Sequence, residues 1–351
     1  MRKDWKPSRR LLCDLLALPT APLLESHVIA FVRRFAARYR LRLRQDRFGN
    51  IFLANRGRGR TRCVVMAHMD HPGIVVTAIH GRQMEAKILG GLHRPHMARA
   101  RFRFFPDERG SRPVRVTGRI GRDHLRLPLL TDVTVGTFGM LDLPPVRWAR
   151  GLVLARVIDN LAGCAEVLDW LRAFARSPHR VMGVLTRGEE IGMRGAAALV
   201  RSRQLPRHVP MLVLEASSAA AARVEIGGGP VLRVGDRLVN FDPRIDCWVQ
   251  ETANRLAGED RDFVYQRALM CGGVMEASLY VLDGLLVGAL ALPLGNYHNR
   301  GPRGPAPEYI AWRDWCRLQQ LLRALVVAPP VPQVVRCLRR RLLQAQVPER
   351  R

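Results

Sequence analysis

The sequence predicts an α/β fold in which a mixed sheet lies between layers of helices and a small all-β domain is inserted. Apolar runs of strand length, such as 63–67 and 181–186, alternate along the chain with segments of helical spacing. Between about 74 and 147 the pattern changes to short alternating runs separated by Gly, Pro, Asp and Arg. The 351 residues, 48% of them hydrophobic, suffice for one large domain and a smaller one.

The first 76 residues begin the larger domain. Segments 11–18 and 23–39 have helical spacing and are separated by a Pro-containing break. Segment 41–53 predicts two strands joined by a tight turn. The apolar run 63–67 predicts a buried parallel strand, and His68 and Asp70 follow it directly.

Residues 77–147 are expected to form the inserted β domain. They contain short alternating runs and no convincing helical period, and a pair of prolines at 144–145 marks the exit. We therefore assign 1–76 and 148–335 to a discontinuous larger domain and 336–351 to a basic C-terminal tail.

The remaining strands of the larger domain each lead to an acidic residue or a histidine. The runs 151–158, 181–186, 211–214 and 285–292 precede, in that order, Asp159, the pair Glu189–Glu190, Glu215 and His298. Helices are expected at 165–175, 196–200, 246–257 and 308–327. Gly272 and Gly273 lead into a further helix, where their backbone amides could hold an anion.

The charge of the chain is strongly positive. The formal net charge is +27, and 54 of the 57 basic residues are arginine. Because the arginines are spread along the whole chain and are not interleaved with aromatic residues, we expect no specific nucleic-acid site. Weak, non-specific attraction to polyanions follows from the charge alone.

The cysteine pattern indicates a reducing compartment. The seven cysteines are scattered, odd in number and form no Cys-x-x-Cys pair, so we expect reduced thiols, a cytoplasmic location and no thiolate zinc site. No run of about 18 apolar residues is present, so no membrane span is expected. The apolar stretch near the N-terminus is interrupted by Asp14 and is interpreted as a helix, not a signal peptide.

The polar residues that follow the strands are more informative together than singly. Singly, each has a simple structural explanation, such as an exposed turn at Glu189 or a helix cap at Asp159. Together they line the crevice beyond the carboxyl ends of the strands, where α/β sheets bind ligands. Two histidines and three carboxylates make two metal sites if Asp159 is shared, and the remaining glutamate can accept a proton. Asp70 can orient His68 by contacting the ring nitrogen that does not bind the metal.

These motifs resemble those of the co-catalytic dinuclear-zinc exopeptidases, and most closely the branch of glutamyl and tetrahedral aminopeptidases. The matching pieces lie in the family's order between about 11 and 327: Asp46-x-Phe-Gly-Asn50, Ala67-His68-Met69-Asp70, Asp159-Asn160-x-x-Gly163, Glu189-Glu190-Ile-Gly-x-Arg-Gly-Ala196, Gly272-Gly273 and His298. The resemblance implies a defined set of ligands. His68 and Glu215 would bind one metal ion, Glu190 and His298 the other, and Asp159 would bridge them, with Glu189 as general base and Asp70 orienting His68.

The resemblance also implies the cofactors and the assembly. It leads us to expect two divalent metal ions, zinc in the first place with cobalt or manganese as alternatives. It further implies a homo-oligomer that assembles through the inserted β domain.

Three positions depart from the family pattern. His71 stands where an acidic residue is usual, Leu161 where an arginine is usual, and Glu215 where aminopeptidases of this branch have aspartate. A glutamate at the last position resembles carboxypeptidases and acyl-amino-acid hydrolases of the wider clan. We therefore expect a metal-dependent aminopeptidase acting on peptides, with a carboxypeptidase or N-acyl amino acid amidohydrolase as the alternative. A non-catalytic polyanion-binding protein is the least favoured hypothesis.

Overall fold

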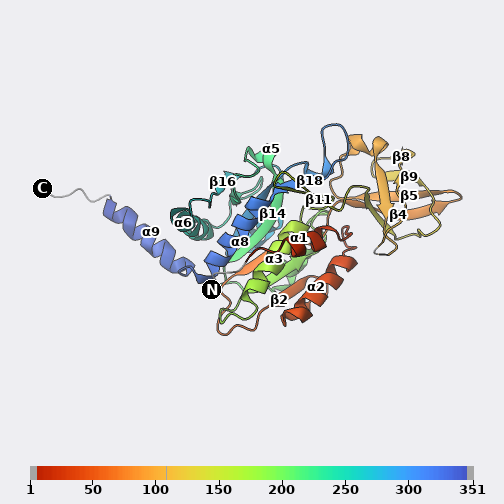
Figure 1. Ribbon diagram of the computed structural model, residues 1–351. Coiled ribbons are helices and arrows are strands. Elements are labelled where there is room, and N and C mark those ends of the chain that lie inside the picture. Colours follow the sequence, from red (N-terminus) through yellow and green to blue (C-terminus); the bar gives the residue numbers. More distant parts are fainter. Residues whose placement is uncertain (1–5, 108, 346–351) are drawn as a thin grey trace.

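The computed structural model describes residues 6–107 and 109–345, and its centre is a mixed sheet of eight strands (Figure 1). The strands follow the order β1-β2-β13-β3-β14-β17-β15-β16. The four central strands β13, β3, β14 and β17 are parallel. Strand β2 pairs antiparallel with β1 and β13, whereas β15 pairs antiparallel with β17 and parallel with β16. The strands are β1 (Arg42–Gln45), β2 (Ile51–Ala54), β3 (Val64–His68), β13 (Met182–Thr186), β14 (Met211–Ser218), β15 (Val231–Gly235), β16 (Gln266–Leu269) and β17 (Val287–Leu294).

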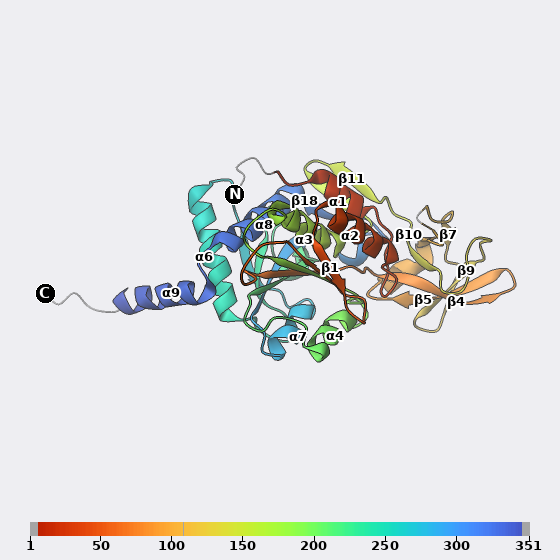
Figure 2. The same ribbon diagram turned by 90° about the horizontal axis from the view of Figure 1, so that it is seen from below.

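Helices cover both faces of this sheet, as Figure 2 shows. One face carries α1 (Arg9–Leu16), α2 (Ser26–Arg38), α3 (Leu161–Phe174), α6 (Pro243–Glu259) and α8 (Trp312–Val327). The opposite face carries α4 (Arg194–Ser202) and α7 (Glu276–Leu282), and a short helix α5 (Ala219–Ala222) follows β14. The predicted α/β fold, a mixed sheet between helix layers, is confirmed. The central helix α3 begins four residues earlier than expected, directly after Asp159 and Asn160.

A second sheet lies at one end of the molecule and has a hydrophobic core of its own. Its seven strands pair only antiparallel, in the order β7-β6-β10-β4-β5-β9-β8. They are β4 (Gly73–His80), β5 (Gln83–Leu89), β6 (Arg101–Phe104), β7 (Val114–Arg115), β8 (Gly118–Ile120), β9 (His124–Pro128) and β10 (Phe138–Leu141). One 3-10 turn, η1 (Arg94–Arg99), interrupts the strands. We refer to this part as the β unit.

A third, three-stranded sheet was not expected. It contains β11 (Val146–Ala149), β12 (Leu152–Ala155) and β18 (Glu308–Ala311), and a 3-10 turn η2 (Tyr297–Asn299) precedes β18. The strand predicted at 151–158 is therefore shorter and belongs to this small sheet. The helix predicted at 308–327 begins only at Trp312, because the four residues before it pair with β12.

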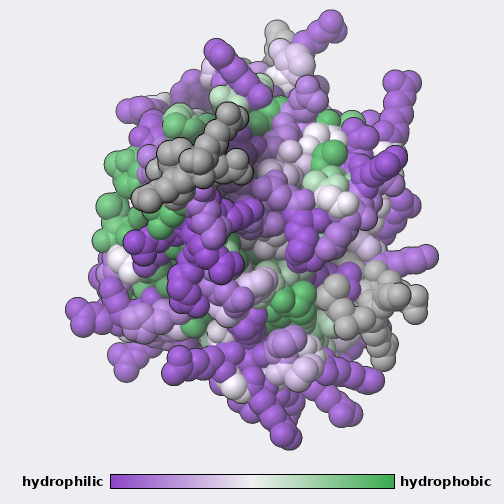
Figure 3. All heavy atoms as spheres, turned by 90° about the vertical axis from the view of Figure 1, so that its left-hand side faces the viewer, coloured by the Kyte–Doolittle hydropathy of each residue, from purple (hydrophilic) through white to green (hydrophobic). Residues whose placement is uncertain are grey.

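The last described residues form a helix that extends into the segment assigned to the basic C-terminal tail. Helix α9 (Val331–Ala345) packs its first turns on α6 and then extends away from the body (Figures 1 and 2). Figure 3 shows this end of the molecule, where hydrophilic side chains cover most of the surface. Residues 346–351 of the predicted basic tail lie outside the described residues. None of the described helices has the length and apolar character of a membrane span by itself. Among the described helices, only α8 and α9 taken together have the required length and apolar character, and they are bent by 90° where they meet.

Candidate metal centre and active site

The fold brings the five predicted metal ligands to one edge of the main sheet. His68 ends β3, and Glu190 lies in the turn after β13. His298 lies in η2 after β17, and Asp159 lies between β12 and α3. Glu215 differs from the prediction, because β14 continues to Ser218 and the residue lies inside the strand. Since β13, β3, β14 and β17 are parallel neighbours, their carboxyl ends meet at this edge.

Asp159 lies between two groups of potential ligands. Its Oδ1 atom is 3.4 Å from His68 Nε2, which is also 3.6 Å from Glu215 Oε2. Its Oδ2 atom is 3.6 Å from His298 Nε2, which is 3.0 Å from Glu190 Oε1. Within each group, ligand atoms of all three residues lie within 4.8 Å of one another. The carboxylate of Asp159 is thus shared by two three-residue groups.

The electrostatics of this centre fit divalent cations. Asp159 Oδ1 and His298 Nε2 are buried beside oppositely charged groups, but neither makes a hydrogen bond within the described part of the chain, which is costly unless something binds them. Burial raises the pKa of the Asp159 carboxyl to about 8, against the opposing effect of His68. Burial alone would lower the pKa of His68, but the surrounding carboxylates, Glu215 foremost, raise it well above its usual range. Imidazole nitrogens with carboxylate oxygens are the donor set of zinc and similar ions.

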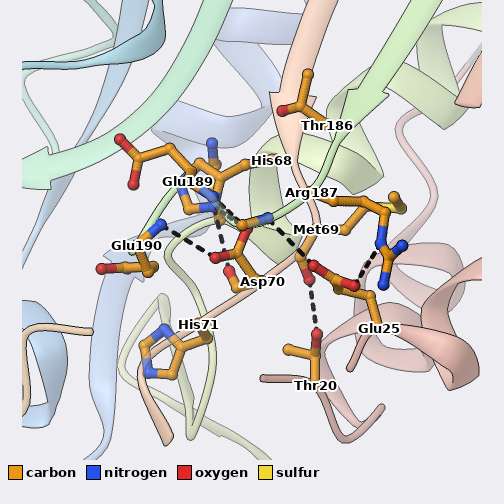
Figure 4. Close-up of polar contacts among 12 residues, drawn as sticks. Thr20, Glu25, His68, Met69, Asp70, His71, Thr186, Arg187, Glu189 and Glu190 are labelled. Carbon is orange, nitrogen blue, oxygen red and sulfur yellow. Dashed lines mark hydrogen bonds and ion pairs between the residues drawn. The ribbon is translucent and has the colours of Figure 1, made fainter. Parts of the chain in front are cut away.

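Asp70 contacts both His68 and the turn that carries the two glutamates (Figure 4). Its Oδ1 atom lies 3.5 Å from His68 Nδ1, and its backbone carbonyl oxygen lies 3.1 Å from the same nitrogen. Its two carboxylate oxygens also accept hydrogen bonds from the backbone N–H groups of Glu189 and Glu190, each at 3.0 Å. Asp70 therefore directs the Nε2 atom of His68 towards Asp159 and fixes the Glu189–Glu190 turn as well.

Glu189 belongs to neither ligand group. Its side chain lines a cavity of about 250 Å³ together with His68, Asp159 and Glu215. Burial raises the pKa of its carboxyl well above the usual range, and although His68 acts against this, the neighbouring carboxylates Glu215 and Glu190 add to the increase. A carboxyl group with a raised pKa beside a cavity is suited to accepting and returning a proton.

A buried network supports the turn from the side opposite the cavity. The Glu25 carboxylate accepts hydrogen bonds from the Gly188 backbone N–H at 3.2 Å and from Arg187 Nε at 2.7 Å. The side chain of Asn50 accepts from the Arg187 backbone N–H at 3.1 Å and donates to the Gly195 carbonyl oxygen at 3.1 Å. Asp46 in turn binds the Asn50 amide at 2.8 Å. The motif at 46–50 therefore supports the Glu189–Glu190 turn, although it is far away in sequence.

The β unit also reaches the metal centre. The carbonyl oxygen of Gly91, just after β5, is 3.2 Å from His298 Nδ1 and is positioned to accept a hydrogen bond from it. That bond would leave His298 Nε2 facing Glu190 and Asp159. A Cβ atom at Gly91 would collide with the His298 ring, and one at Gly90 would lie only 3.2 Å from Glu190 Cβ. The two glycines thus permit the close approach of this loop to the ligands.

Two further residues at the centre were not predicted as functional. His71, one of the departures from the family pattern, is buried and hydrogen-bonded to the Asp159 carbonyl oxygen through Nδ1 and, at 3.1 Å, to Asn299 Oδ1 through Nε2. Glu308, placed in a helix by the sequence analysis, is a buried strand residue that binds backbone amides on both sides of the centre. His71 follows the motif Ala67-His68-Met69-Asp70 directly, so its position marks it, whereas Glu308 has no neighbouring motif.

The cavity beside Glu189 continues away from the metal centre along β14 and β15. Its far part is lined by Ser217, Arg233, Gly272, Gly273 and Arg300. Arg233 is buried, and its guanidinium donates to Ser217 Oγ at 3.0 Å and to the Met270 carbonyl oxygen at 3.2 Å. The glycine pair precedes α7, which has only seven residues, so the anion site expected at a helix start is not supported by a long helix.

Part of the chain that carries this site matches a known protein family. Residues 130–301, which contain four of the five proposed ligands and Glu189, match the family model described as M42 glutamyl aminopeptidase. A curated relative from Acetivibrio thermocellus, provisionally named an aminopeptidase, is 24% identical over 276 residues, or 73% of this chain and 81% of the relative.

Solved structures share the whole fold. A TET aminopeptidase from the marine sediment archaeon Thaumarchaeota archaeon SCGC AB-539-E09 has a TM-score of 0.78 at 18% identity, covering 93% of this chain and 98% of that one. The TET1 peptidase of Pyrococcus horikoshii, described as assembling into a tetrahedron or a large octahedral shell, has a TM-score of 0.75 at 19% identity, covering 90% and 98%. The expected resemblance to dinuclear-zinc exopeptidases of the glutamyl and tetrahedral aminopeptidase branch is confirmed, and it supports a metal-dependent aminopeptidase activity.

Proposed function

We propose that this metal-dependent aminopeptidase binds two divalent cations, zinc in the first place, at the two groups that share Asp159. His68 and Glu215 would hold one ion, Glu190 and His298 the other, and Asp159 both. The shared carboxylate between two three-residue groups is the observation that carries this proposal. When bound, such a pair of cations would supply Lewis-acid activation of water and of the scissile carbonyl group.

Glu189 is the proposed general base. Its carboxylate lines the cavity beside the ligands and has a raised pKa, so it can take a proton from the attacking water. The same carboxyl group can then deliver the proton to the leaving amine. Asp70 contributes by holding the backbone of Glu189 and the ring of His68 in place, so the base and one ligand are positioned by a single side chain.

The cavity also indicates which part of the substrate the enzyme would bind. Arg233 and Arg300 line the far part of the cavity, where their guanidinium groups could bind a carboxylate of the substrate. In an aminopeptidase that carboxylate would belong to an acidic side chain. In a carboxypeptidase or an N-acyl amino acid hydrolase it would be the terminal carboxylate, and Glu215 in place of aspartate favours keeping this second candidate.

A substrate panel separates the two candidates. Metal-free protein would be supplied with zinc, cobalt or manganese in turn and assayed with aminoacyl amides of acidic, neutral and basic residues and with N-acyl amino acids. We expect metal-dependent release of the amine from aminoacyl amides. Turnover confined to N-acyl amino acids would establish the second candidate, and absence of turnover with every metal and substrate would contradict both.

Assembly and location complete the proposal. We expect at least a homodimer formed through the β unit, because the core of a unit of about 70 residues is small and the unit gains from covering more of its surface. The self-assembly described for the P. horikoshii peptidase supports this expectation. A cytoplasmic location is supported by the cysteines, which are all free in the structure.

A further inference from the structure

Glu308 is a buried carboxylate at the metal centre that is not one of the proposed ligands. It lies on β18, and its side chain is 0% exposed. Ionised side chains are rarely buried without partners, so the groups that surround this carboxylate indicate its role.

All of its side-chain partners are backbone amides next to metal ligands. Glu308 Oε2 accepts hydrogen bonds from the N–H groups of Ile158 at 2.7 Å and Asp159 at 3.0 Å. Glu308 Oε1 accepts one from the N–H group of His298 at 2.8 Å. Hydrogen bonds to an ionised acceptor are short and strong compared with neutral ones. One carboxylate thus connects the shared ligand Asp159 with the terminal ligand His298.

These two ligands reach the centre from different sheets. Asp159 follows β12 of the three-stranded sheet, whereas His298 follows β17 of the main sheet. Glu308 is paired with Ala155 of β12, and the next residue, Tyr309, exchanges backbone hydrogen bonds with Gly295 at 2.9 and 3.2 Å. Strand β18 therefore lies at the junction of the two sheets, with the carboxylate of Glu308 directed between them.

The backbone at His298 needs such support. His298 has a φ of 53°, and its neighbours Asn296 and Asn299 also have positive φ values of 53° and 58°. Left-handed backbone conformations are unfavourable for residues other than glycine and persist where the surroundings hold them. The hydrogen bond from His298 N–H to Glu308 is one of the contacts that hold this turn.

We propose that Glu308 is a positioning residue that sets the spacing of Asp159 and His298 and so determines the affinity of the metal centre. The inference rests on the proposed function, in that it assumes that these residues bind divalent cations. Residues that orient metal ligands typically change metal affinity about 10- to 100-fold when they are replaced.

The test compares Glu308→Gln with a matched control, Asp314→Asn. Asp314 is also a buried carboxylate that accepts two backbone hydrogen bonds, from Gly227 at 2.5 Å and Gly229 at 2.9 Å, but it belongs to neither ligand group. Zinc stoichiometry and affinity would be measured on the full-length proteins by competition with a chelator, and folding by thermal unfolding of the metal-free forms.

We expect wild type and Asp314→Asn to bind two zinc ions with equal affinity, and Glu308→Gln to bind about 10- to 100-fold more weakly. If Glu308→Gln does not fold, Glu308→Asp replaces it, because the shorter side chain cannot span both amides and should show the same loss. Unchanged affinity in the Glu308 variant, or an equal loss in Asp314→Asn, would overturn the positioning role alone. A wild-type protein that binds no zinc would overturn both the proposed metal centre and the positioning role of Glu308.

Discussion

Glu189 and Glu190 are neighbours in sequence, but their surroundings give them different properties. Burial raises the pKa of the Glu189 carboxyl, and the nearby carboxylates Glu215 and Glu190 increase it further. Burial acts most strongly to raise the pKa of Glu190, but His298 together with His68 and His71 outweighs that effect, so the pKa is lowered. A carboxylate with an increased proton affinity suits a base, and one that remains ionised suits a metal ligand.

Replacing Glu189 by glutamine should remove the base and keep the centre. The amide has nearly the same shape, and Glu189 belongs to neither ligand group. We expect turnover to fall by roughly 10²–10⁴-fold, the usual contribution of general acid–base catalysis, with two metal ions still bound. Steady-state kinetics and metal analysis of the purified variant measure both quantities. Near-full activity would show that another group moves the proton.

Replacing Asp159 by asparagine should, unlike the Glu189 change, remove the metal ions. Its two carboxylate oxygens face different ligand groups, and an amide nitrogen at either position cannot bind a cation. We expect the protein to lose metal from both sites and activity with it, as measured by metal analysis after dialysis. If this variant kept both ions while Glu189→Gln lost them, the roles of base and bridge would be reversed.

The metal-free protein should lose stability as the pH rises. In the folded state the pKa of Asp159 is raised from 3.8 to about 8 and that of His298 from 6.5 to about 9. Both groups bind protons more tightly when folded, so each stabilises the fold at low pH and ceases to do so as the pH passes its folded pKa. Denaturant unfolding of the metal-free form should therefore show decreasing stability between about pH 5 and 9. Stability that rises over this range would contradict the assigned environments.

Residue patterns indicated the proposed ligands but not the residues that support them. His68, Asp159, Glu190, Glu215 and His298 were proposed because each comes after an apolar run in the sequence, and all of them except Glu215 belong to a matching motif. Glu308 could not, because its carboxylate is significant only through backbone amides 10 and about 150 residues away, and such contacts leave no local pattern. Gly91 was overlooked for the same reason, since its contact is made by a backbone oxygen.

At the scale of elements, apolar runs in the sequence predicted six of the eight strands of the main sheet but not β15 and β16, and they failed where a strand and a helix adjoin. Glu308–Ala311 has buried and partly buried positions in an order that also fits the first turn of α8. The pairing with β12 decides in favour of a strand, and pairing partners distant in sequence cannot be deduced from periodicity. The short antiparallel runs of the β unit were recognised because turn residues separate them clearly.

Two asparagines at opposite ends of β13 allow the turn-supporting network to be tested. Asn50 binds the backbone at Arg187 and Gly195 near the catalytic turn, whereas Asn55 binds the backbone at Val181 at 3.0 Å and at Phe174 at 2.7 Å near the other end. Each Asn→Ala change leaves buried backbone groups without partners and should cost about 1–3 kcal/mol of unfolding free energy.

Only the Asn50→Ala change should also reduce the turnover number, because it loosens the turn that carries Glu189. Denaturant unfolding and kinetics at saturating substrate, carried out on both variants, separate stability from positioning. A similar reduction in turnover for Asn55→Ala would mean that general destabilisation, not the position of the turn, explains the effect.

For the whole molecule, the net charge of +27 and the proposed assembly act against each other. Copies of a strongly basic chain repel one another, and the repulsion is screened over about 10 Å at 0.1 M ionic strength and about 3 Å at 1 M. An interface formed by the β unit must overcome this repulsion through the apolar surface that it buries, which salt does not weaken. Added salt should therefore strengthen association, in contrast to an interface made of ion pairs.

Light scattering at micromolar concentration over a series of salt concentrations tests this expectation. The chain has a mass of 39.6 kDa, so a measured mass of at least twice that value, constant or rising with salt, supports a homo-oligomer held by apolar contacts. A mass that falls with salt would indicate an interface dominated by charge pairs. A mass of 39.6 kDa at every salt concentration would show that the β unit does not assemble the protein and that its contact with His298 through Gly91 is made within a monomer.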